Sequence, residues 1–360
     1  MDNLGQLVCV GFQGTRSTDP GVQRVISLAE AGMVSGVILY RYNIENPAQT
    51  RELIGAFKKA QAPFPLFVML DQEGGKVQRI NSAKGFSDTA SAKRVAVEFS
   101  LQQAYDHYAS LGQELSKLGF NFDFAPCIDL DSTPTCEVIG ALERSYGSDS
   151  NIVSQCAEQM INGLSEHGVI SCAKHFPGHG SASGDSHLGL VDITSTWNER
   201  ELEPYQMLQS RGLLDVVMSA HLVHQGIDSD TPITFSARWI EKLRTEVGFD
   251  GVVVTDDLHM GALVYNYSFD DICVRPLLAG HDLLIFSNNP LASQHQGIRH
   301  DEKSGVQTWA DSLTVPDENI AEHAFRSLRR ALDENIINEK NIERSIQRII
   351  DLKQRFKLGQ

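Results

Sequence analysis

Eight short, almost wholly apolar runs recur along the chain, and helical spacing of apolar residues fills most of the gaps between them. The runs lie at residues 7–11, 34–40, 65–70, 121–128, 170–174, 215–220, 251–255 and 282–286. Near-continuous apolar runs, rather than strict alternation, are typical of parallel strands that are covered on both faces. The alternation of such strands with helices therefore predicts an α/β protein with a parallel sheet.

The strand count favours one closed architecture. Eight strands alternating with helices fit a single (β/α)8 TIM-type barrel. A doubly wound open sheet would need a glycine fingerprint after an early strand, and GFQGTR at residues 11–16 matches it poorly. Because no linker rich in Pro, Gly and Ser divides the sequence, residues 1–360 are predicted to form one barrel domain.

Two helices can be placed from apolar residues three or four positions apart. The first has a predicted buried face made of Leu101, Ala104, Tyr108, Leu111 and Leu115. The second lies near the end of the chain, and its predicted buried face is made of Ile342, Ile346, Ile349 and Phe356.

Composition excludes several classes of function. The 360 residues include 31 Lys and Arg against 46 Asp and Glu, which gives a formal charge of −15 and argues against a nucleic-acid ligand. No uncharged apolar run approaches the roughly 18 residues of a membrane span. The first basic residue is Arg16, so the start of the chain does not resemble a secretory signal. We expect a cytoplasmic protein with no membrane partner, and the sequence carries no signal for an oligomeric state.

The six cysteines are scattered and show no metal-ligand spacing, so we expect reduced, partly buried thiols. They are Cys9, Cys127, Cys136, Cys156, Cys172 and Cys273.

Polar or charged residues follow most of the predicted strands. They are Arg41, Asp71, Lys174 with His175, His221, and Asp256 with Asp257. Barrel enzymes build their active sites at the carboxyl ends of the strands. The sequence thus predicts a ring of functional side chains at one end of the barrel.

The densest group of titratable residues is the stretch KHFPGHGSASGDSHLGL at residues 174–190. One interpretation is a metal site, and another is a loop with solvated polar residues. The third is a histidine general acid and base. The candidate metal ligands are His175, His179, Asp185 and His187.

The sequence of the loop bears on this choice. Pro177, Gly178 and Gly180 make a helix improbable, so the four-residue spacing does not place two imidazoles on one face. Asp185 and His187 suit the acid–base role, because a carboxylate on one ring nitrogen fixes the tautomer and frees the other nitrogen. Small residues at 180–184 would let such a loop move a proton donor toward a leaving group.

Two further strand ends carry carboxylates. Successive side chains on a strand point to opposite faces, so one of Asp256 and Asp257 is expected to enter the barrel mouth and the other to cap the backbone. The entering carboxylate is a candidate nucleophile, base or metal ligand. Asp71 precedes a Gly-Gly turn and Arg79, which indicates a ligand role, whereas Arg144 in ERSYG is a weak signal alone.

These segments together resemble the bacterial β-N-acetylglucosaminidases of glycoside hydrolase family 3. The matching segments are DQEGGKVQR, ERSYGSD, AKHFPGHGSASGDSH, VVMSAH and GVVVTDDLHM, in this order along nearly the whole chain. In this branch of the family the enzyme is a single (β/α)8 barrel, in agreement with the strand count.

The resemblance implies a retaining mechanism on a terminal β-linked N-acetylglucosamine, without a metal or another cofactor. It implies that Asp256 is the nucleophile, that His187 is the acid/base and that Asp185 orients His187. The implied substrate is a peptidoglycan fragment (a muropeptide) or a chitin oligosaccharide. The residues that match the family's sugar-binding positions are Asp71, Arg79, Arg144, Lys174 and His175.

The sequence departs from the family pattern at a few positions. Lys76 stands where many relatives carry arginine, and His259 and Met260 stand where small or polar residues are usual. Residues 288–314 are polar and irregular, and we expect a solvated insertion there.

Other functions fit the same residues. A β-N-acetylglucosaminide phosphorylase would use phosphate in place of water, and a β-glucosidase would accept glucose in place of N-acetylglucosamine. A metal-dependent hydrolase would use the histidines of the 174–190 stretch. A sugar-binding protein without catalysis would need neither Asp256 nor the pair of Asp185 and His187.

Overall fold

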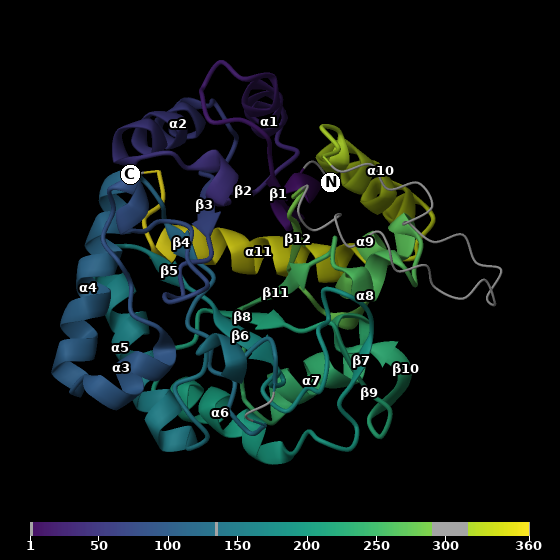
Figure 1. Ribbon diagram of the computed structural model, residues 1–360. Helices are drawn as coiled ribbons and strands as arrows, with labels where there is room; N and C mark the ends of the chain where they lie inside the picture. Colours follow the sequence, from purple (N-terminus) through teal and green to yellow (C-terminus); the bar gives the residue numbers. More distant parts are fainter. Residues whose placement is uncertain (1–2, 134–135, 290–315, 360) are drawn as a thin grey trace.

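The computed structural model of the protein describes residues 3–133, 136–289 and 316–359. A sheet of parallel strands forms its centre and helices surround the sheet, as predicted (Figure 1). The strands are β1 Val8–Gly11, β2 Gly36–Ile38, β3 Phe67–Leu70, β4 Phe122–Asp123, β5 Ile170–Ser171, β6 Ala173–Phe176, β8 Val216–Ser219, β11 Val252–Asp257 and β12 Leu283–Phe286.

The barrel closes through its fifth predicted strand, which the structure divides in two. The strand order is β5-β4-β3-β2-β1-β12-β11-β8-β6, so β5 and β6 are the two ends of the sheet. Only Cys172 separates them in the sequence, and β5 pairs with β4 while β6 pairs with β8. One continuous piece of chain therefore joins both ends of the sheet, which confirms the barrel and its eight-strand count.

Helices cover the outside of the barrel (Figure 1). They are α1 Pro20–Glu30, α2 Pro47–Lys59, α3 Ala92–Glu98, α4 Leu101–Leu118, α5 Ser150–Glu166, α6 Glu203–Ser210, α7 Ala237–Thr245, α8 Gly261–Val264, α9 Phe269–Ala279, α10 Ile320–Asp333 and α11 Glu339–Arg355. Within the described residues, no helix is both long enough and apolar enough to cross a membrane.

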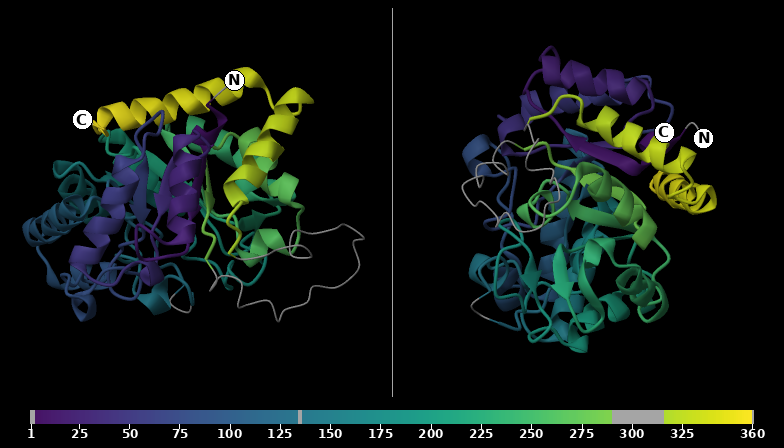
Figure 2. Two further views of the ribbon diagram at one scale, coloured as in Figure 1. Left: turned by 90° about the horizontal axis from the view of Figure 1, so that it is seen from above. Right: turned by 90° about the vertical axis from the view of Figure 1, so that its right-hand side faces the viewer.

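The last helix closes the amino-terminal end of the barrel. Lys353 of α11 donates hydrogen bonds to Gln6 and Ser35, which precede β1 and β2. Ser345 donates to Asp282, the residue before β12. Figure 2 shows α11 lying across one end of the strands, so the opposite end is left open for a site.

The two predicted helices form, with one correction. Ala104, Tyr108, Leu111 and Leu115 of α4 are buried, but Leu101 is 44% exposed. Leu101 is the first residue of the helix and lies at the edge of its apolar stripe, so it is not covered. In α11 the predicted isoleucines are buried, and Phe356 follows the last helical residue and packs partly buried against the core.

A small second sheet was not predicted from the sequence. It consists of β7 Val191–Asp192, β9 Leu222–His224 and β10 Asp228–Pro232, in the order β10-β9-β7. Strands this short carry no clear apolar period, so the sequence gives little sign of them. Because β7 follows the 174–190 stretch directly, the sheet anchors the far end of that stretch beside the segment after β8.

All six cysteines are buried and none forms a disulfide in the structure.

Candidate active site

A cavity of about 380 Å³ lies at the carboxyl ends of the barrel strands. Pockets that hold small ligands are typically about 300–1,000 Å³. All eight site residues predicted from the sequence line this cavity, namely Asp71, Arg79, Arg144, Lys174, His175, Asp185, His187 and Asp256.

Two of the predicted strand-end residues do not belong to the cavity wall. Arg41 is exposed and donates hydrogen bonds to the carbonyls of Lys76 and Gln78, each at 2.8 Å. His221 is fully buried and bonds Thr234 and the carbonyl of Asp257. Both residues therefore stabilise neighbouring backbone, and the predicted ring of functional side chains is smaller than expected.

Lys174 is the central cation of one cavity wall. Its Nζ lies 2.9 Å from Asp71 Oδ1 and 2.7 Å from Glu73 Oε1, and its side chain is only 3% exposed. Burial lowers the pKa of this amine, but the charges of Glu73 and Asp71 raise it well above its usual range. Lys174 thus remains protonated.

Asp71 is shared between two cations. Besides Lys174, Arg79 Nη2 donates to Asp71 Oδ2 at 2.8 Å. Burial raises the pKa of Asp71, whereas the charges of Lys174 and Arg79 lower it to about 2. The Arg79 guanidinium also lies over the ring of Tyr40, 5.5 Å from its centroid. Three of the predicted sugar-binding residues, Asp71, Arg79 and Lys174, are therefore ion-paired with one another.

Glu73 is a site residue that sequence reasoning missed. Its two carboxylate oxygens accept from Nε and Nη2 of Arg144 at 2.8 and 2.7 Å, and Oε1 also bonds Lys174. Burial raises the pKa of Glu73, but the charges of Arg144 and Lys174 hold it well below its usual range. The residue lies in the DQEGG segment two positions after Asp71, and this position at a strand end was the available signal.

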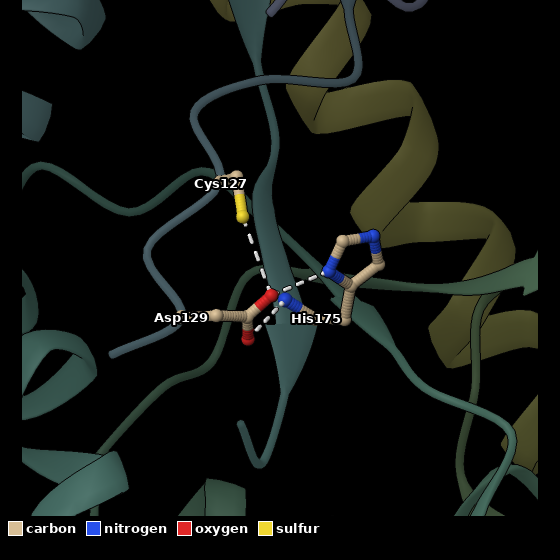
Figure 3. Close-up of side chains that lie close together, drawn as sticks. All are labelled: Cys127, Asp129 and His175. Atoms are coloured by element: carbon tan, nitrogen blue, oxygen red, sulfur yellow. Dashed lines mark hydrogen bonds and ion pairs between the residues drawn. The ribbon is translucent and has the colours of Figure 1, made fainter. Parts of the chain in front are cut away.

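Asp129 is the second missed residue, and its carboxylate lies beside the ring of His175 (Figure 3). After β4 the chain runs beside β6, with a hydrogen bond from Ile128 N to Lys174 O, which places the Asp129 carboxylate against His175. Burial raises the pKa of Asp129, and the contacts with His175 and His179 lower it to about 2. The apolar run at 121–128 ends at this aspartate, a signal that the sequence analysis did not use.

The two aspartates at the end of β11 differ in their contacts. Asp257 Oδ1 accepts from the backbone N–H groups of Ser287 and His259, at 2.8 and 3.1 Å, so Asp257 caps the backbone as expected for one of the pair. Asp256 Oδ1 accepts from Asp257 N at 2.7 Å. Both residues line the cavity, contrary to the expectation that only one would enter it. The register irregularity of β11 between Val254 and Asp257 breaks the regular alternation of side chains there.

Asp185 and His187 form a pair at the cavity rim. His187 Nδ1 lies 2.7 Å from Asp185 Oδ1, and the His187 side chain is 54% exposed. Loss of solvent lowers the pKa of His187, but the hydrogen bond and charge of Asp185 and the charge of Asp256 raise it overall. The geometry leaves Nε2 of His187 as the nitrogen that can exchange a proton with a ligand.

The backbone of this pair is held by the chain after β11. His187 O accepts from Gly261 N at 3.1 Å, and Ser186 O accepts from Ala262 N at 3.2 Å. A Cβ at Gly261 would lie 2.6 Å from His187 O, so a side chain there would push the two segments apart. The glycine thus permits the segment bearing His187 to approach the segment bearing Asp256.

The four candidate metal ligands of the sequence analysis do not form a cluster. His179 bonds Ser186, and His187 bonds Asp185. Across the described parts of the chain, the one group of three His, Cys, Asp or Glu ligand atoms within 4.8 Å of each other is Cys127, Asp129 and His175 (Figure 3).

Of the residues that depart from the family pattern, some line the cavity and others do not. Lys76 donates to the carbonyl of Ala141 at 3.2 Å, and Met260 lines the cavity. His259 is buried with Nδ1 3.6 Å from Asp257 Oδ1. The predicted insertion at 288–314 lies outside the described residues from residue 290 onward, and Asn289 lines the cavity.

Glu201 lies behind the loop that leads to His187. It is 1% exposed, and neither carboxylate oxygen makes a well-formed hydrogen bond to a described residue. Burial raises its pKa to about 8, against a small lowering by the nearby Ser181 hydroxyl. A Cβ at Gly178 would lie 2.1 Å from Glu201 Oε2, so the carboxyl packs directly against the loop backbone.

Comparison with known proteins gives a consistent result. The family described as Glycosyl hydrolase family 3 N terminal domain matches residues 2–352. A β-hexosaminidase of Haemophilus influenzae is 31% identical over 352 residues, which cover 93% of each chain. A β-hexosaminidase of Histophilus somni is 33% identical over 284 residues, covering 75% of this chain and 77% of the relative.

Solved structures agree with the fold. A family 3 β-N-acetylglucosaminidase from Paenibacillus sp. superposes with a TM-score of 0.85 at 31% identity, and this chain spans 63% of its length. A β-N-acetylhexosaminidase from Beutenbergia cavernae superposes with a TM-score of 0.80 at 25% identity, with 98% of each chain covered.

The pKa of Glu201 predicts a pH-dependent stability. In the unfolded chain the carboxyl ionises near its ordinary value of 4.5, whereas in the folded protein it stays protonated up to about 8. The stability that the protonated group contributes is therefore complete below pH 4.5 and is lost as pH rises toward 8, by at most about 1.4 kcal/mol per pH unit. Glu201→Gln removes this loss, so the Tm of the variant minus that of the wild type should increase from pH 5 to pH 8.

The matched control is Glu199→Gln, in the same turn and 82% exposed, for which the Tm difference should not change with pH. Parallel melting curves for wild type and Glu201→Gln across this range would contradict the prediction.

Proposed function

Since the chain belongs to glycosyl hydrolase family 3, whose N-terminal domain matches residues 2–352, we propose that it removes terminal β-linked N-acetylglucosamine from muropeptides or chitin oligosaccharides. Relatives named β-hexosaminidase support the broader conclusion that it is a glycoside hydrolase with β-N-acetylhexosaminidase activity. The observation that carries the proposal is that Asp256, Asp185 and His187 line one cavity.

The proposed reaction has two steps with opposite proton transfers. In the first, the Asp256 carboxylate attacks the anomeric carbon while protonated His187 donates its Nε2 proton to the glycosidic oxygen, which leaves with the aglycone. A covalent glycosyl–Asp256 ester results. In the second, neutral His187 takes a proton from water, and the hydroxide attacks the anomeric carbon and releases Asp256. Two inversions give a product with retained configuration.

A histidine in this role avoids an electrostatic conflict. A second carboxylate close to Asp256 would have one of the two pKa values raised by like-charge repulsion. An imidazolium beside Asp256 is instead stabilised. Burial lowers the pKa of His187, but Asp185 and Asp256 raise it, and the result is a pKa above the ordinary value. His187 can therefore carry the proton that the leaving group needs.

The paired charges around Lys174 and Asp71 suit the binding of a sugar. Hydroxyl groups both donate and accept hydrogen bonds, so a carboxylate and a guanidinium side by side can hold one diol. Asp71 with Arg79 forms such a pair, and Lys174 and Arg144 extend it along the wall. We assign these residues, with His175, to binding of the terminal sugar.

The experiment that tests this function compares two aryl glycosides with and without phosphate. We expect kcat/KM for an aryl β-N-acetylglucosaminide to exceed that for the matching aryl β-glucoside by on the order of 100-fold or more, because the two sugars differ at the 2-substituent. We expect free N-acetylglucosamine as product in both buffers. Formation of the sugar 1-phosphate would identify a phosphorylase, and equal turnover of the glucoside would identify a β-glucosidase.

The nucleophile can be identified by covalent trapping. A 5-fluoro derivative of N-acetylglucosaminyl fluoride slows hydrolysis of the glycosyl–enzyme, so peptide mapping by mass spectrometry should find the sugar on Asp256. Asp256→Asn should lower kcat by on the order of 10⁴-fold or more. A label on Asp257 or Asp71 would contradict the assignment, and circular dichroism of the variant controls for its folding.

The acid role of His187 predicts a dependence on the leaving group. Without the proton donor, an alkoxide is a poor leaving group, whereas a nitrophenolate needs no protonation. His187→Ala should therefore lower kcat/KM for N-acetylglucosamine oligosaccharides by on the order of 10²–10⁴-fold and for the nitrophenyl glycoside much less. Equal losses on the two substrates would exclude the acid role.

A further inference from the structure

We propose that Asp129 is a positioning residue that fixes His175 as the neutral Nδ1–H tautomer, so that Nε2 of His175 accepts a hydrogen bond from Arg144 and orients that guanidinium in the sugar site. The tautomer follows from the contacts of His175 alone. The part that this tautomer plays in sugar binding rests on the proposed function.

Asp129 accepts four hydrogen bonds in a buried position. Its Oδ1 accepts from the backbone N–H groups of His175 and His179 at 3.0 and 2.9 Å. Its Oδ2 lies 2.7 Å from His175 Nδ1 and 3.3 Å from Cys127 Sγ (Figure 3). An ionised carboxylate has acceptors only, so the ring nitrogen that faces it must carry hydrogen.

The other ring nitrogen of His175 faces a group that has donors only. Nε2 lies 3.1 Å from Nη2 of Arg144, and a guanidinium cannot accept a hydrogen bond. Nε2 must therefore present its lone pair. The two neighbours require the same state of the ring, with hydrogen on Nδ1 and none on Nε2. In both the other tautomer and the imidazolium, Nε2–H of His175 would point at an N–H of Arg144.

This arrangement determines what Arg144 can offer a ligand. Nε and Nη2 donate to Glu73, Nη1 donates to the carbonyl of Val138 at 2.9 Å, and the second Nη2 hydrogen meets His175. Four of the five N–H bonds are thus engaged by described residues. The guanidinium is held in one orientation, and the remaining Nη1 hydrogen is the donor available for a sugar hydroxyl.

The same contacts oppose a metal ion at Cys127, Asp129 and His175. A metal bound at Nδ1 would need the lone pair that the Nδ1–H tautomer lacks. The 2.7 Å separation of Nδ1 and Oδ2 is that of a hydrogen bond, whereas two ligands about 2 Å from one tetrahedral zinc ion lie farther apart. The three residues are therefore part of a chain of hydrogen bonds that runs from the Asp129 carboxylate through His175 to Arg144.

The test is Asp129→Asn, because asparagine has the same shape. Its carbonyl oxygen can keep both backbone hydrogen bonds, while its amide donates where Oδ2 accepted. The amide then favours a lone pair on Nδ1, which moves the hydrogen of His175 to Nε2 and directs it at Arg144. ¹⁵N NMR of histidine-labelled full chain reports the tautomer directly, and His175→Gln assigns the signals by their loss.

In the wild type we expect Nδ1–H and bare Nε2 for His175, unchanged on addition of Zn²⁺. In Asp129→Asn we expect the pattern to be inverted and KM for the aryl N-acetylglucosaminide to rise 10- to 100-fold, with kcat changed less than 5-fold. Cys127→Ala is the matched control: it removes the thiol from the same carboxylate oxygen and should keep the wild-type tautomer and KM.

A wild-type His175 that is protonated at Nε2, or whose signals shift with Zn²⁺, would overturn the proposal even if the asparagine variant did not fold. A bare Nε2 in Asp129→Asn would overturn it as well. Because the NMR signals require no substrate, failure of the proposed function would appear instead as absent turnover with the expected tautomer.

Discussion

The ion pairs of buried Lys174 with Asp71 and Glu73 are the interaction on which the site depends. Lys174 lies on β6, where the barrel closes, whereas both carboxylates follow β3, and β4 lies between β3 and the strand formed by β5 and β6. The pairs therefore join the closing strand to a strand two places away around the barrel mouth. Among the described residues, removing Lys174 would leave Asp71 paired only with Arg79 and Glu73 only with Arg144, and unbalancing charges that are buried is more costly than loss of an exposed pair. These charges therefore hold together the cavity wall that Asp71, Glu73 and Lys174 form.

The barrel could be predicted from the sequence because its strands are buried on both faces and so read as unbroken apolar runs. The same criterion could not find β7, β9 and β10, which are two to five residues long and include polar positions. Nor could it foresee the division between β5 and β6, because Cys172 is as apolar as its neighbours and the division lies only in hydrogen bonding. Leu101 was wrongly predicted to be buried because residue spacing identifies an apolar stripe on a helix but not how far the neighbouring elements cover that stripe.

The site residues could be predicted to the extent that a barrel brings all its strand ends to one place. Spacing and residue type did not identify the carboxylates that hold a basic side chain of the cavity in place. Glu73, which lines the cavity itself, and Asp129 are of this kind, and their partners lie 71 and 46 positions away in the sequence, in Arg144 and His175. Such pairings depend on the fold and carry no local pattern.

Partners rather than burial decide the charge of the carboxylates around the cavity. The group around Lys174 and His175 combines three cations with three carboxylates of lowered pKa: Arg79, Arg144 and Lys174 with Asp71, Glu73 and Asp129. Asp123 is as deeply buried, yet burial raises its pKa to about 7, with Asp71 and Glu73 adding to the effect against Lys174. With a fourth anion the negative charges would outnumber the positive ones, and with a protonated His175 the positive charges would outnumber the negative ones. With the charges of this group balanced, the remaining aspartate and histidine side chains that line the cavity, Asp185, His187, Asp256 and Asp257, determine the field at a bound sugar.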